Sequence, residues 1–586
     1  MSSLRCCRSA PRVLTLLVGL AWSAGAAAQD VESFLAGVTE RIGSGDVLRV
    51  AGSLQLRGGL NAFASAAGAQ RRNAPLTYGA TAGLHFDLLG IQAPFTLAYA
   101  NRNTTYGLPS YTFAGLSPSY RWITLHGGDR SLTFSPYSLS GVTFRGGGFE
   151  LSPGRWRVAG MRGRLRTERL EDAGADQSGL LLALRRTGQG LQLGYGTDAT
   201  GVSASVFHSR DRVTATAPLT DTLRRVNAPE ANLVVTLAAR HAFSPALSAE
   251  LEYARSALTR DTEAAPLPEA SPAQTMLGLH DANVTTSGAG AFKGAIRFAP
   301  ALATFGLTYE RIDPEYRTHG TLYLQDDTEN VTASVAVPLL ARRLQVSVDG
   351  GVQRNDLRGR RASRLRRLIG SAQVQYRWTE RVQTSVAVSN LNTVSRLRVL
   401  DLSRPTIDSV VLAQTQASLT ASTAAMLDAA GERRVVAVVT LQRGRLIRDD
   451  EVDPARATSF QLASVTYAEQ ARGARLGYTL GLVANRSATA VAEVLTVGPQ
   501  AGLRARLLGE ALTADASANL NLRRVAAPTA PDPTTAALLH ASLTAAYALT
   551  ERQSLRLLGR LVRAGDTDAL PGYTDTQINL EYGLRF

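Results

Sequence analysis

Two neighbouring segments of the chain carry opposite charges at a density that could bind ions. The first holds Asp313, Glu315, Asp326, Asp327 and Glu329, and the second holds Arg354, Arg358, Arg360, Arg361, Arg364, Arg366 and Arg367. Calcium needs about six to eight oxygens in a compact arrangement, and this spacing fits no EF-hand loop. Guanidinium groups bind phosphates bidentately. The simplest interpretation is that the two segments pair with each other. Anion or lipid-phosphate binding by the arginines and calcium binding by the carboxylates stay open.

Other residues that could do chemistry are scattered. The seven histidines show no motif that ties one of them to a nucleophile, and no phosphate loop or metal-spaced cluster is present. His85 and His540 fall on polar faces of predicted strands. We therefore predict no enzymatic activity, no cofactor and no metal.

The beginning of the chain predicts export. Arg5, Arg8 and Arg12 precede an apolar run at residues 13–22, and three alanines at 26–28 form a small-residue cleavage site. This pattern is typical of a secretory signal peptide over residues 1–28, and residues 29–46 form a short polar lead. Cys6 and Cys7 both lie in the segment that would be removed.

Composition narrows the class further. The net charge of +15 comes almost entirely from arginine, because Lys293 is the only lysine. Such a charge could indicate nucleic acid binding, but we predict no nucleic acid partner for an exported chain whose arginines are spread along its length. No stretch reaches the roughly 18 consecutive apolar residues of a membrane helix, and the mean hydropathy is −0.04.

From Val47 onward the chain alternates between apolar and polar residues. The most regular run places Leu512, Ala514, Ala516, Ala518, Leu520 and Leu522 opposite Thr513, Asp515, Ser517, Asn519, Asn521 and Arg523. Successive side chains of a strand point to opposite faces, so each run has one apolar and one polar wall. Runs of about ten such residues are the signature of transmembrane strands.

The connections between these runs alternate between tight turns and longer segments. Tight turns are predicted near Gly90, Pro300, Glu380 and Gly509, while the longer segments include residues 213–230, 258–288, 394–412 and 447–457. Short turns on one side and longer loops on the other are what a membrane-spanning barrel has. We predict an all-β fold over residues 47–586: one antiparallel transmembrane β-barrel of about 24–26 strands, with 22 as the lower limit.

The last strand carries a resemblance to a known class of proteins. Residues 574–586 alternate and end on an aromatic residue, with Tyr582, Leu584 and Phe586 on the apolar face. This ending resembles the C-terminal assembly signal of Gram-negative outer-membrane β-barrels. The resemblance implies insertion by the barrel-assembly machinery, location in the outer membrane, and contact with outer-membrane lipid and lipopolysaccharide. The strand should close the barrel against residues 47–56.

One block is less regular than the rest. Residues 116–130 and Gly146-Gly147-Gly148 gather aromatic residues and glycines without clean alternation. A bulged strand with Trp122 in the interfacial girdle is the favoured interpretation, and a constriction of the lumen is the alternative. Residues 129–141 form either a short strand or an inward bend, because Pro136 is tolerated in a sheet only at an edge or bulge.

The strand number and the polar faces suggest a function. Barrels of 16 to 18 strands already leave an aqueous channel, and inward Arg504, Arg506, Asp515, Arg523 and Glu581 would give a wall of mixed charge. We predict a passage for a large or polymeric solute, blocked by inward loops, with 258–288 the longest candidate, or by a periplasmic or lipoprotein partner. The alternative is a structural barrel that scaffolds partner subunits and conducts nothing.

Overall fold

The structure is a computed structural model. It describes residues 47–65, 74–101, 111–167, 169–171, 181–212, 228–267, 269, 275–276, 278–361, 363–400, 407–428, 430–448, 451–471, 473–527, 532–566 and 571–586. The predicted signal peptide and lead lie outside the described residues. Within the described part of the chain, no helix is long and apolar enough to span a membrane.

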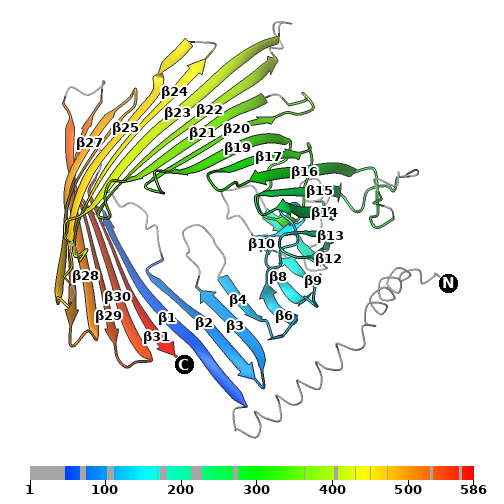
Figure 1. Ribbon diagram of the computed structural model, residues 1–586, viewed down its shortest axis with the longest axis horizontal. Coiled ribbons are helices and arrows are strands. Elements are labelled where there is room, and N and C mark those ends of the chain that lie inside the picture. Colours follow the sequence, from blue (N-terminus) through cyan, green and yellow to red (C-terminus); the bar gives the residue numbers. More distant parts are fainter. Residues whose placement is uncertain are drawn as a thin grey trace.

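The described chain is almost entirely β-strand (Figure 1). The strands of the first half are β1 Leu48–Ser65, β2 Leu76–Leu88, β3 Ile91–Ala100, β4 Tyr111–Leu116, β5 Ser119–Tyr120, β6 Ile123–Arg130, β7 Leu139–Ser140, β8 Phe144–Leu151, β9 Trp156–Arg166, β10 Arg169–Glu171, β11 Leu181–Ala183, β12 Arg185–Gly196, β13 Gly201–Arg212, β14 Ala231–Ser244 and β15 Leu247–Thr259. Those of the second half are β16 Thr286–Phe298, β17 Thr304–Ile312, β18 Gly320–Thr321, β19 Thr328–Leu339, β20 Leu344–Asn355, β21 Ser363–Arg377, β22 Val382–Leu400, β23 Ile407–Met426, β24 Arg433–Arg448, β25 Glu451–Glu469, β26 Leu476–Ala488, β27 Glu493–Leu507, β28 Leu512–Ala526, β29 Thr534–Ala548, β30 Gln553–Ala564 and β31 Tyr573–Arg585.

These strands form one closed antiparallel barrel. The main sheet has 27 strands, of which β4 and the two-residue β5 share one position between β3 and β6, which leaves 26 positions in the wall. The sheet closes because β1 pairs with β2 on one side and with β31 on the other. The prediction of about 24–26 strands is confirmed. Closure matters because it pairs every strand edge, which is required of a sheet that lies in lipid.

The two rims of the barrel differ as the loop pattern predicts. The rim that holds the C-terminal end of β31, here the C-terminal rim, has tight turns such as Leu89 and Gly90, whose φ angles of 54° and 92° fit a two-residue hairpin turn. The opposite rim, here the loop rim, holds most of the longer connections. Two of these are shorter than predicted, because β22 and β23 leave only residues 401–406 between them, and β24 and β25 leave only 449–450. In both hairpins the backbone hydrogen bonds between the two strands continue into residues that no longer alternate between apolar and polar.

The closing strand has the predicted neighbour in a different register. β31 pairs with Ser53–Ser65 of β1, so that Ser53 lies opposite Arg585 and Ser65 opposite Tyr573. The prediction of residues 47–56 is therefore wrong in register, although the two segments share Ser53 to Leu56. The strands of a closed barrel are tilted and staggered. This stagger comes from the whole barrel and cannot be read from one strand.

Two connections of the loop rim fold into the barrel (Figure 1). Residues 131–143, between β6 and β8, and residues 313–327, between β17 and β19, meet where β7 pairs in parallel with β18. The inward bend considered for residues 129–141 is thus confirmed from residue 131 onward. Residues 116–130 belong to the wall, with an irregular step between β4 and β5, as the bulged-strand interpretation predicts.

The predicted inward position of residues 258–288 is wrong. Met276 of this connection packs against Leu233 and Ala257, with Val206 and Val235 alongside. These wall residues share the face of Val202 and Tyr253, which line an apolar groove on the outside of the barrel. The described part of the connection therefore covers the outer face, because its apolar side chains find an apolar surface there.

Candidate functional site

The register of the sheet determines which side chains face the lumen. Directly opposite residues on paired strands point to the same face. Glu252 and Glu310 contact the inward residues 131–143, so both face inward. Following the pairs around the sheet places Arg504, Asp515 and Glu581 on this same inner face, while Leu503 and Leu580 face outward with 51% and 47% of their surface exposed.

The lumen-wall residues predicted from the sequence lie in two groups near the C-terminal rim. Arg504 Nε donates to Asp515 Oδ1 at 2.5 Å, and Arg506 Nη1 lies 3.7 Å from Glu510 Oε1. Glu581 accepts a hydrogen bond from Arg57 Nε at 2.7 Å, and Arg556 lies on its other side at 4.0 Å.

Arg523 stands apart from both groups. It lies on the same face of β28, nearer the loop rim and opposite Thr496.

Water reaches these charged side chains. The exposed fractions are 64% for Arg57, 57% for Arg556, 53% for Arg504 and 43% for Asp515. Arg504 and Asp515 line a hollow of about 900 Å³ together with Gln500, Asn519, His540 and Ser542. We call β20–β31 together with β1 and β2 the bare sector, because its described inward side chains meet solvent.

The opposite part of the wall is covered from inside. In the lined sector, which comprises β8, β9 and β12–β17, the inward Phe207, Asn232, Val234 and Ala254 have 0% exposure near the loop rim. Residues 131–143 and 313–327, together the inner layer, cover them. Leu132, Phe134, Leu139 and Val142 form one apolar cluster with Phe144, Met161 and Phe207, whereas Tyr137 and Tyr316 form another with Ala254, Ala289, Ala291 and Ile312.

Polar contacts attach the inner layer to the wall at fixed points. The Tyr137 hydroxyl donates to Glu310 Oε1 at 2.5 Å, and the Ser135 hydroxyl donates to Glu252. Gln192 Nε2 donates to the Phe134 carbonyl at 2.9 Å.

The two segments of the inner layer are also joined to each other. The Tyr316 hydroxyl donates to the Tyr137 carbonyl at 2.7 Å, and the Thr318 hydroxyl donates to the Ser138 carbonyl at 2.6 Å. The inner layer is therefore one connected unit.

Glycines of the wall make room for this unit. A Cβ added at Gly190 would lie 2.6 Å from the ring of Phe134, and one at Gly148 would lie 3.3 Å from Cδ1 of Leu132. A larger residue would displace these side chains, so the inward glycines and the apolar side chains of residues 131–143 fit each other.

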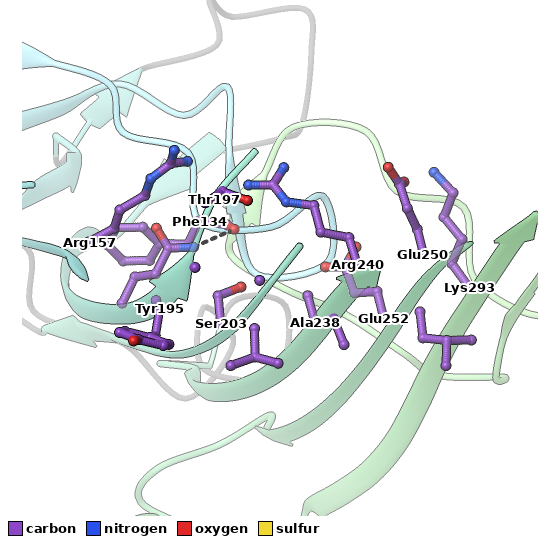
Figure 2. A pocket seen from close by; sticks show the side chains of 17 residues that line it. Phe134, Arg157, Tyr195, Thr197, Ser203, Ala238, Arg240, Glu250, Glu252 and Lys293 are labelled. Atoms are coloured by element: carbon purple, nitrogen blue, oxygen red, sulfur yellow. Dashed lines mark hydrogen bonds between the residues drawn. The ribbon is translucent and has the colours of Figure 1, made fainter. Parts of the chain in front are cut away.

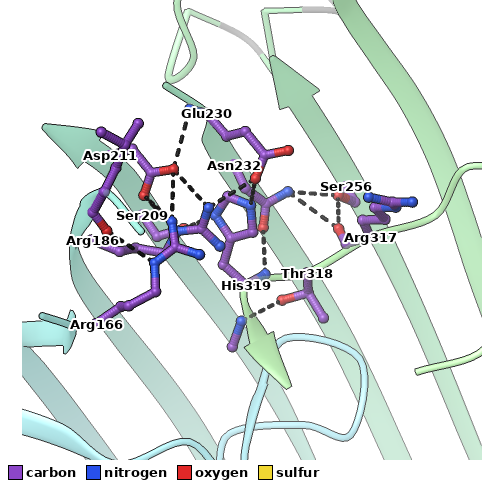
Figure 3. Close-up of polar contacts among 12 residues, drawn as sticks. Arg166, Arg186, Ser209, Asp211, Glu230, Asn232, Ser256, Arg317, Thr318 and His319 are labelled. Carbon is purple, nitrogen blue, oxygen red and sulfur yellow. Dashed lines mark hydrogen bonds and ion pairs between the residues drawn. The ribbon is translucent and has the colours of Figure 1, made fainter. Parts of the chain in front are cut away.

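A buried ionic network lies where the inner layer meets the ends of β12–β14 (Figure 3). Arg186 binds Asp211 through Nε at 2.7 Å and Glu230 through Nη2 at 2.8 Å. Arg166 approaches Asp211 at 3.3 Å, and His319 Nε2 lies 3.1 Å from Glu230. His319 thus links residues 313–327 to the wall.

The protonation states in this network follow from burial and hydrogen bonding. Burial lowers the pKa of His319, so its imidazole is neutral at pH 7. The neutral ring accepts from the Ser209 hydroxyl at Nδ1 and donates from Nε2 to Glu230. The hydrogen bond from His319, together with Arg186, lowers the pKa of Glu230 to about 2. Glu230 is therefore an anion at any physiological pH.

A cavity lies between the inner layer and the C-terminal rim of the lined sector (Figure 2). Its volume is about 310 Å³, and Phe134 lies at its boundary. Charged groups of both signs surround it, namely Arg157, Arg240, Glu250, Glu252 and Lys293. Cationic and anionic groups side by side suit a solute that carries both charges or many hydroxyls, and favour neither small anions nor small cations.

The two charged loops pair with each other, as the simplest interpretation predicts. Arg361 contacts Asp327 at 2.5 Å and Asp326 at 3.5 Å, and Arg354 binds Glu329. Arg358 and Arg360 of the second connection are exposed. Arg364, Arg366 and Arg367 lie in β21 and not in a loop; the first two are exposed, and Arg367 Nη1 donates to Gln353 at 3.3 Å. Anion or lipid-phosphate binding by this loop stays a prediction. Among the described residues, no group of three or more His, Cys, Asp and Glu side chains could hold a metal ion.

The C-terminal residues lie at the seam of the barrel. The Phe586 backbone N–H donates to the Gly52 carbonyl at 3.0 Å, and the Phe586 side chain is 49% exposed. Tyr582 lies opposite Leu56, and Leu584 lies opposite Leu54. Their role as an assembly signal stays a prediction.

The sequence did not predict that residues 131–143 and 313–327 form one unit, or that wall glycines make room for its side chains. One usable signal was the spacing of inward glycines, because Gly146 and Gly148 on β8 and Gly188 and Gly190 on β12 alternate as polar residues do elsewhere. A run of glycines on the inner face predicts that something packs closely against it.

Known structures resemble the barrel only distantly. No family model matches the chain, and no curated protein matches it either. A chain of the Escherichia coli P pilus tip assembly intermediate PapC-PapD-PapK-PapG aligns at 10% identity with a TM-score of 0.39, over 91% of this chain and 60% of that chain. This chain thus spans under two thirds of that protein.

Two further structures are of other kinds. A mutant of the ferric enterobactin receptor PfeA from Pseudomonas aeruginosa has 10% identity and a TM-score of 0.38, over 92% of this chain and 80% of the receptor. OccK1 from Pseudomonas aeruginosa has 10% identity and a TM-score of 0.27, over 61% of this chain and 93% of OccK1.

Proposed function

We propose that this chain forms a passage for a large or polymeric solute across the outer membrane of a Gram-negative bacterium. The closed antiparallel barrel with an apolar outer face is an outer-membrane β-barrel. The observation that carries the proposal is the exposed, polar inner wall of the bare sector, where Arg57, Arg504, Asp515 and Arg556 all meet water.

The width of the barrel supports a large solute. Barrels of about 16 to 18 strands leave an aqueous channel, and this wall has 26 positions. The inner layer occupies one side of the lumen only, so it narrows the passage without replacing the solvent along the bare sector.

The inner wall favours an uncharged or mixed-charge solute. Arg57 and Arg556 flank Glu581, and Arg504 is paired with Asp515. Because charges of opposite sign alternate, the wall has no ladder of one sign that would select small anions or cations. Hydroxyl-rich polymers could slide along such a wall by exchanging hydrogen bonds.

Single-channel recording in planar bilayers tests the proposal. The purified barrel should conduct. Poly(ethylene glycol) molecules that are small enough to enter the lumen should lower the conductance, and larger ones should leave it unchanged, so that the size limit gives the width of the passage. A barrel that stays silent, also after residues 131–143 are replaced by a short Gly-Ser turn, would contradict the passage and favour a scaffold for partner subunits. The matched control shortens the connection that carries Met276, which packs on the outer face, and should leave the conductance unchanged.

A further inference from the structure

Within the lined sector, the outer face of β9, β12 and β13 has a short apolar belt. The outward residues, read from the C-terminal rim, are Trp156, Val158 and Gly160 on β9, then Arg162 and Arg164; Tyr195, Leu193 and Leu191 on β12, then Gln189 and Thr187; and Val202, Ala204 and Val206 on β13, then His208 and Arg210. On each of these strands, small or apolar residues occupy three outward positions before polar side chains begin.

The height of this belt follows from the strand geometry. Trp156 and Tyr195 pack against each other on the outer face, with ring centroids 4.8 Å apart and the ring planes tilted by 57°, where an aromatic girdle marks the membrane interface. Arg162 is six residues further along β9, which corresponds to about 15 Å along the membrane normal for a strand tilted by about 40°. On β28, outward residues from Leu512 to Leu522 stay apolar, and the same conversion gives about 25 Å, the usual height of the band.

Arginines from adjacent strands meet directly above the short belt. Arg145 of β8 lies opposite Arg164 of β9, which lies opposite Thr187 of β12, which in turn lies opposite Arg210 of β13. Arg162 follows on the next outward position of β9. Opposite side chains are about 5 Å apart at Cβ. We call Arg145, Arg162, Arg164 and Arg210 the outer arginine patch.

The patch keeps an excess of positive charge. Asp129 binds Arg145 through both carboxylate oxygens, at 2.8 Å and 2.7 Å. Within the part of the chain that the structure describes, no carboxylate forms an ion pair with Arg162, Arg164 or Arg210. Guanidinium groups that face hydrocarbon without a counter-ion are strongly unfavourable, so an anion must reach them in the membrane.

The surroundings of the patch point to a lipid as the source of that anion. Below it lies an apolar groove of about 780 Å³ on the same outer face, with Leu193, Val202, Leu237 and Phe292 among its lining residues. Beside it, the connection that carries Met276 covers the outer face of β13–β15. A molecule that fills both the patch and the groove needs anionic groups at one end and acyl chains at the other.

We propose that the outer arginine patch binds the phosphate groups of an outer-leaflet glycolipid whose acyl chains occupy the groove below. Each guanidinium offers paired N–H donors that match a phosphate bidentately. Because the patch lies about 15 Å above the aromatic girdle, the bound headgroup sits closer to the membrane midplane here than around the bare sector. The membrane is locally thinner beside β9, β12 and β13.

Native mass spectrometry of the folded barrel in detergent tests this site, with lipid A and dephosphorylated lipid A as probes. The Arg162→Gln/Arg164→Gln variant should retain at least tenfold less lipid A than the parent chain, while Arg162→Lys/Arg164→Lys should retain an intermediate amount. Dephosphorylated lipid A should bind weakly to all variants. Heat-modifiable migration in gels establishes that each variant is folded.

The matched control removes two arginines with the same spacing from the inner face. Arg504→Gln/Arg506→Gln should bind lipid A like the parent chain. Equal lipid A retention by the Arg162→Gln/Arg164→Gln variant would overturn the proposal. Full competition by inorganic pyrophosphate at equal concentration would reduce the site to an anion site without a lipid, and an acidic protein that co-purifies only when Arg162 and Arg164 are present would assign the patch to a protein partner. Each of these two results would also overturn it.

Discussion

The lined and the bare sectors are built from the same kind of strand and differ in what their inner faces meet. In the bare sector the inward residues include arginines, carboxylates and amides, some of them with about half of their surface in water, such as Arg504 and Asp515. Near the loop rim of the lined sector many inward residues are small, such as Ala254, Ala291 and Gly188, and they are buried under the inner layer together with polar residues such as Asn232. The small inward residues of the lined sector therefore leave room for a second layer of protein.

The outer faces of the two sectors differ in the height of their apolar belts. Outward residues of β28 stay apolar from Leu512 to Leu522, whereas those of β9 become charged at Arg162. Part of the sector that gains a layer inside, β9, β12 and β13, thus has a shorter apolar belt outside. The barrel wall is therefore not the same all the way round: one part has a second layer inside and a low apolar belt outside, and the other has a single layer and a high belt. We expect solute to move along the bare sector and lipid phosphates to bind beside β9, β12 and β13.

Removing the two buried tyrosines should break this comparison most severely. Tyr137 and Tyr316 are 1% and 0% exposed, and truncating a large buried side chain costs about 3–5 kcal/mol. Tyr137→Ala with Tyr316→Ala should detach the inner layer, so that proteases cut residues 131–143 while the wall stays intact. Tyr323→Ala, at a residue that is 95% exposed in the same connection, should leave protease resistance unchanged. Resistance of the double variant would show that the layer is held by other contacts.

Replacing one wall glycine that contacts the inner layer should loosen the layer less. Gly190→Val would place a Cβ 2.6 Å from the Phe134 ring, and such overpacking costs about 1–3 kcal/mol. We expect faster hydrogen exchange in residues 131–143, measured by mass spectrometry. Gly83→Val is the matched control, because Gly83 faces the lumen from β2 with no atom within 4 Å of an added Cβ. Equal exchange in both variants would contradict the close fit.

Lowering the pH should loosen the inner layer at its ionic network. Burial lowers the pKa of His319 in the folded protein. The neutral imidazole therefore stabilises the inner layer fully above the pKa of the unfolded chain, about 6.5, and this stabilisation is lost as the pH falls through the lower pKa of the folded protein. The pKa of Glu230, about 2, keeps this carboxylate ionised throughout that range. After correction for the intrinsic pH dependence of amide exchange, the protection factors of residues 313–327 should be lower at pH 5 than at pH 7.5. In His319→Gln the difference should vanish; a difference that persists would assign it to another group.

The smallest effect is expected for an ion pair of the bare sector. Arg504 and Asp515 are about half exposed, and exposed pairs contribute less than about 1 kcal/mol. Arg504→Ala should therefore leave the free energy of unfolding in urea nearly unchanged. A loss of several kcal/mol would mean that the bare sector is also covered, by a partner or by part of the chain outside the described residues.

The barrel architecture could be predicted from the sequence because one face of each membrane strand contacts lipid and the other contacts water. Lipid outside and water inside impose alternation that survives in the residue order, as at Leu512 to Arg523. The strand number, the loop sides and the neighbour of β31 followed from it. The pairing of the charged loops also followed, since consecutive loops on one rim must lie side by side.

The register of closure and the position of each loop were decided only in the tertiary structure. Residues 258–288 and 131–143 both carry apolar side chains, yet Met276 packs on the outer face and Phe134 on the inner face. The difference lies in the surface each one meets, a set of apolar outward residues in one case and inward glycines in the other. Those surfaces are assembled from strands far apart in the chain, so neither loop contains the information that places it.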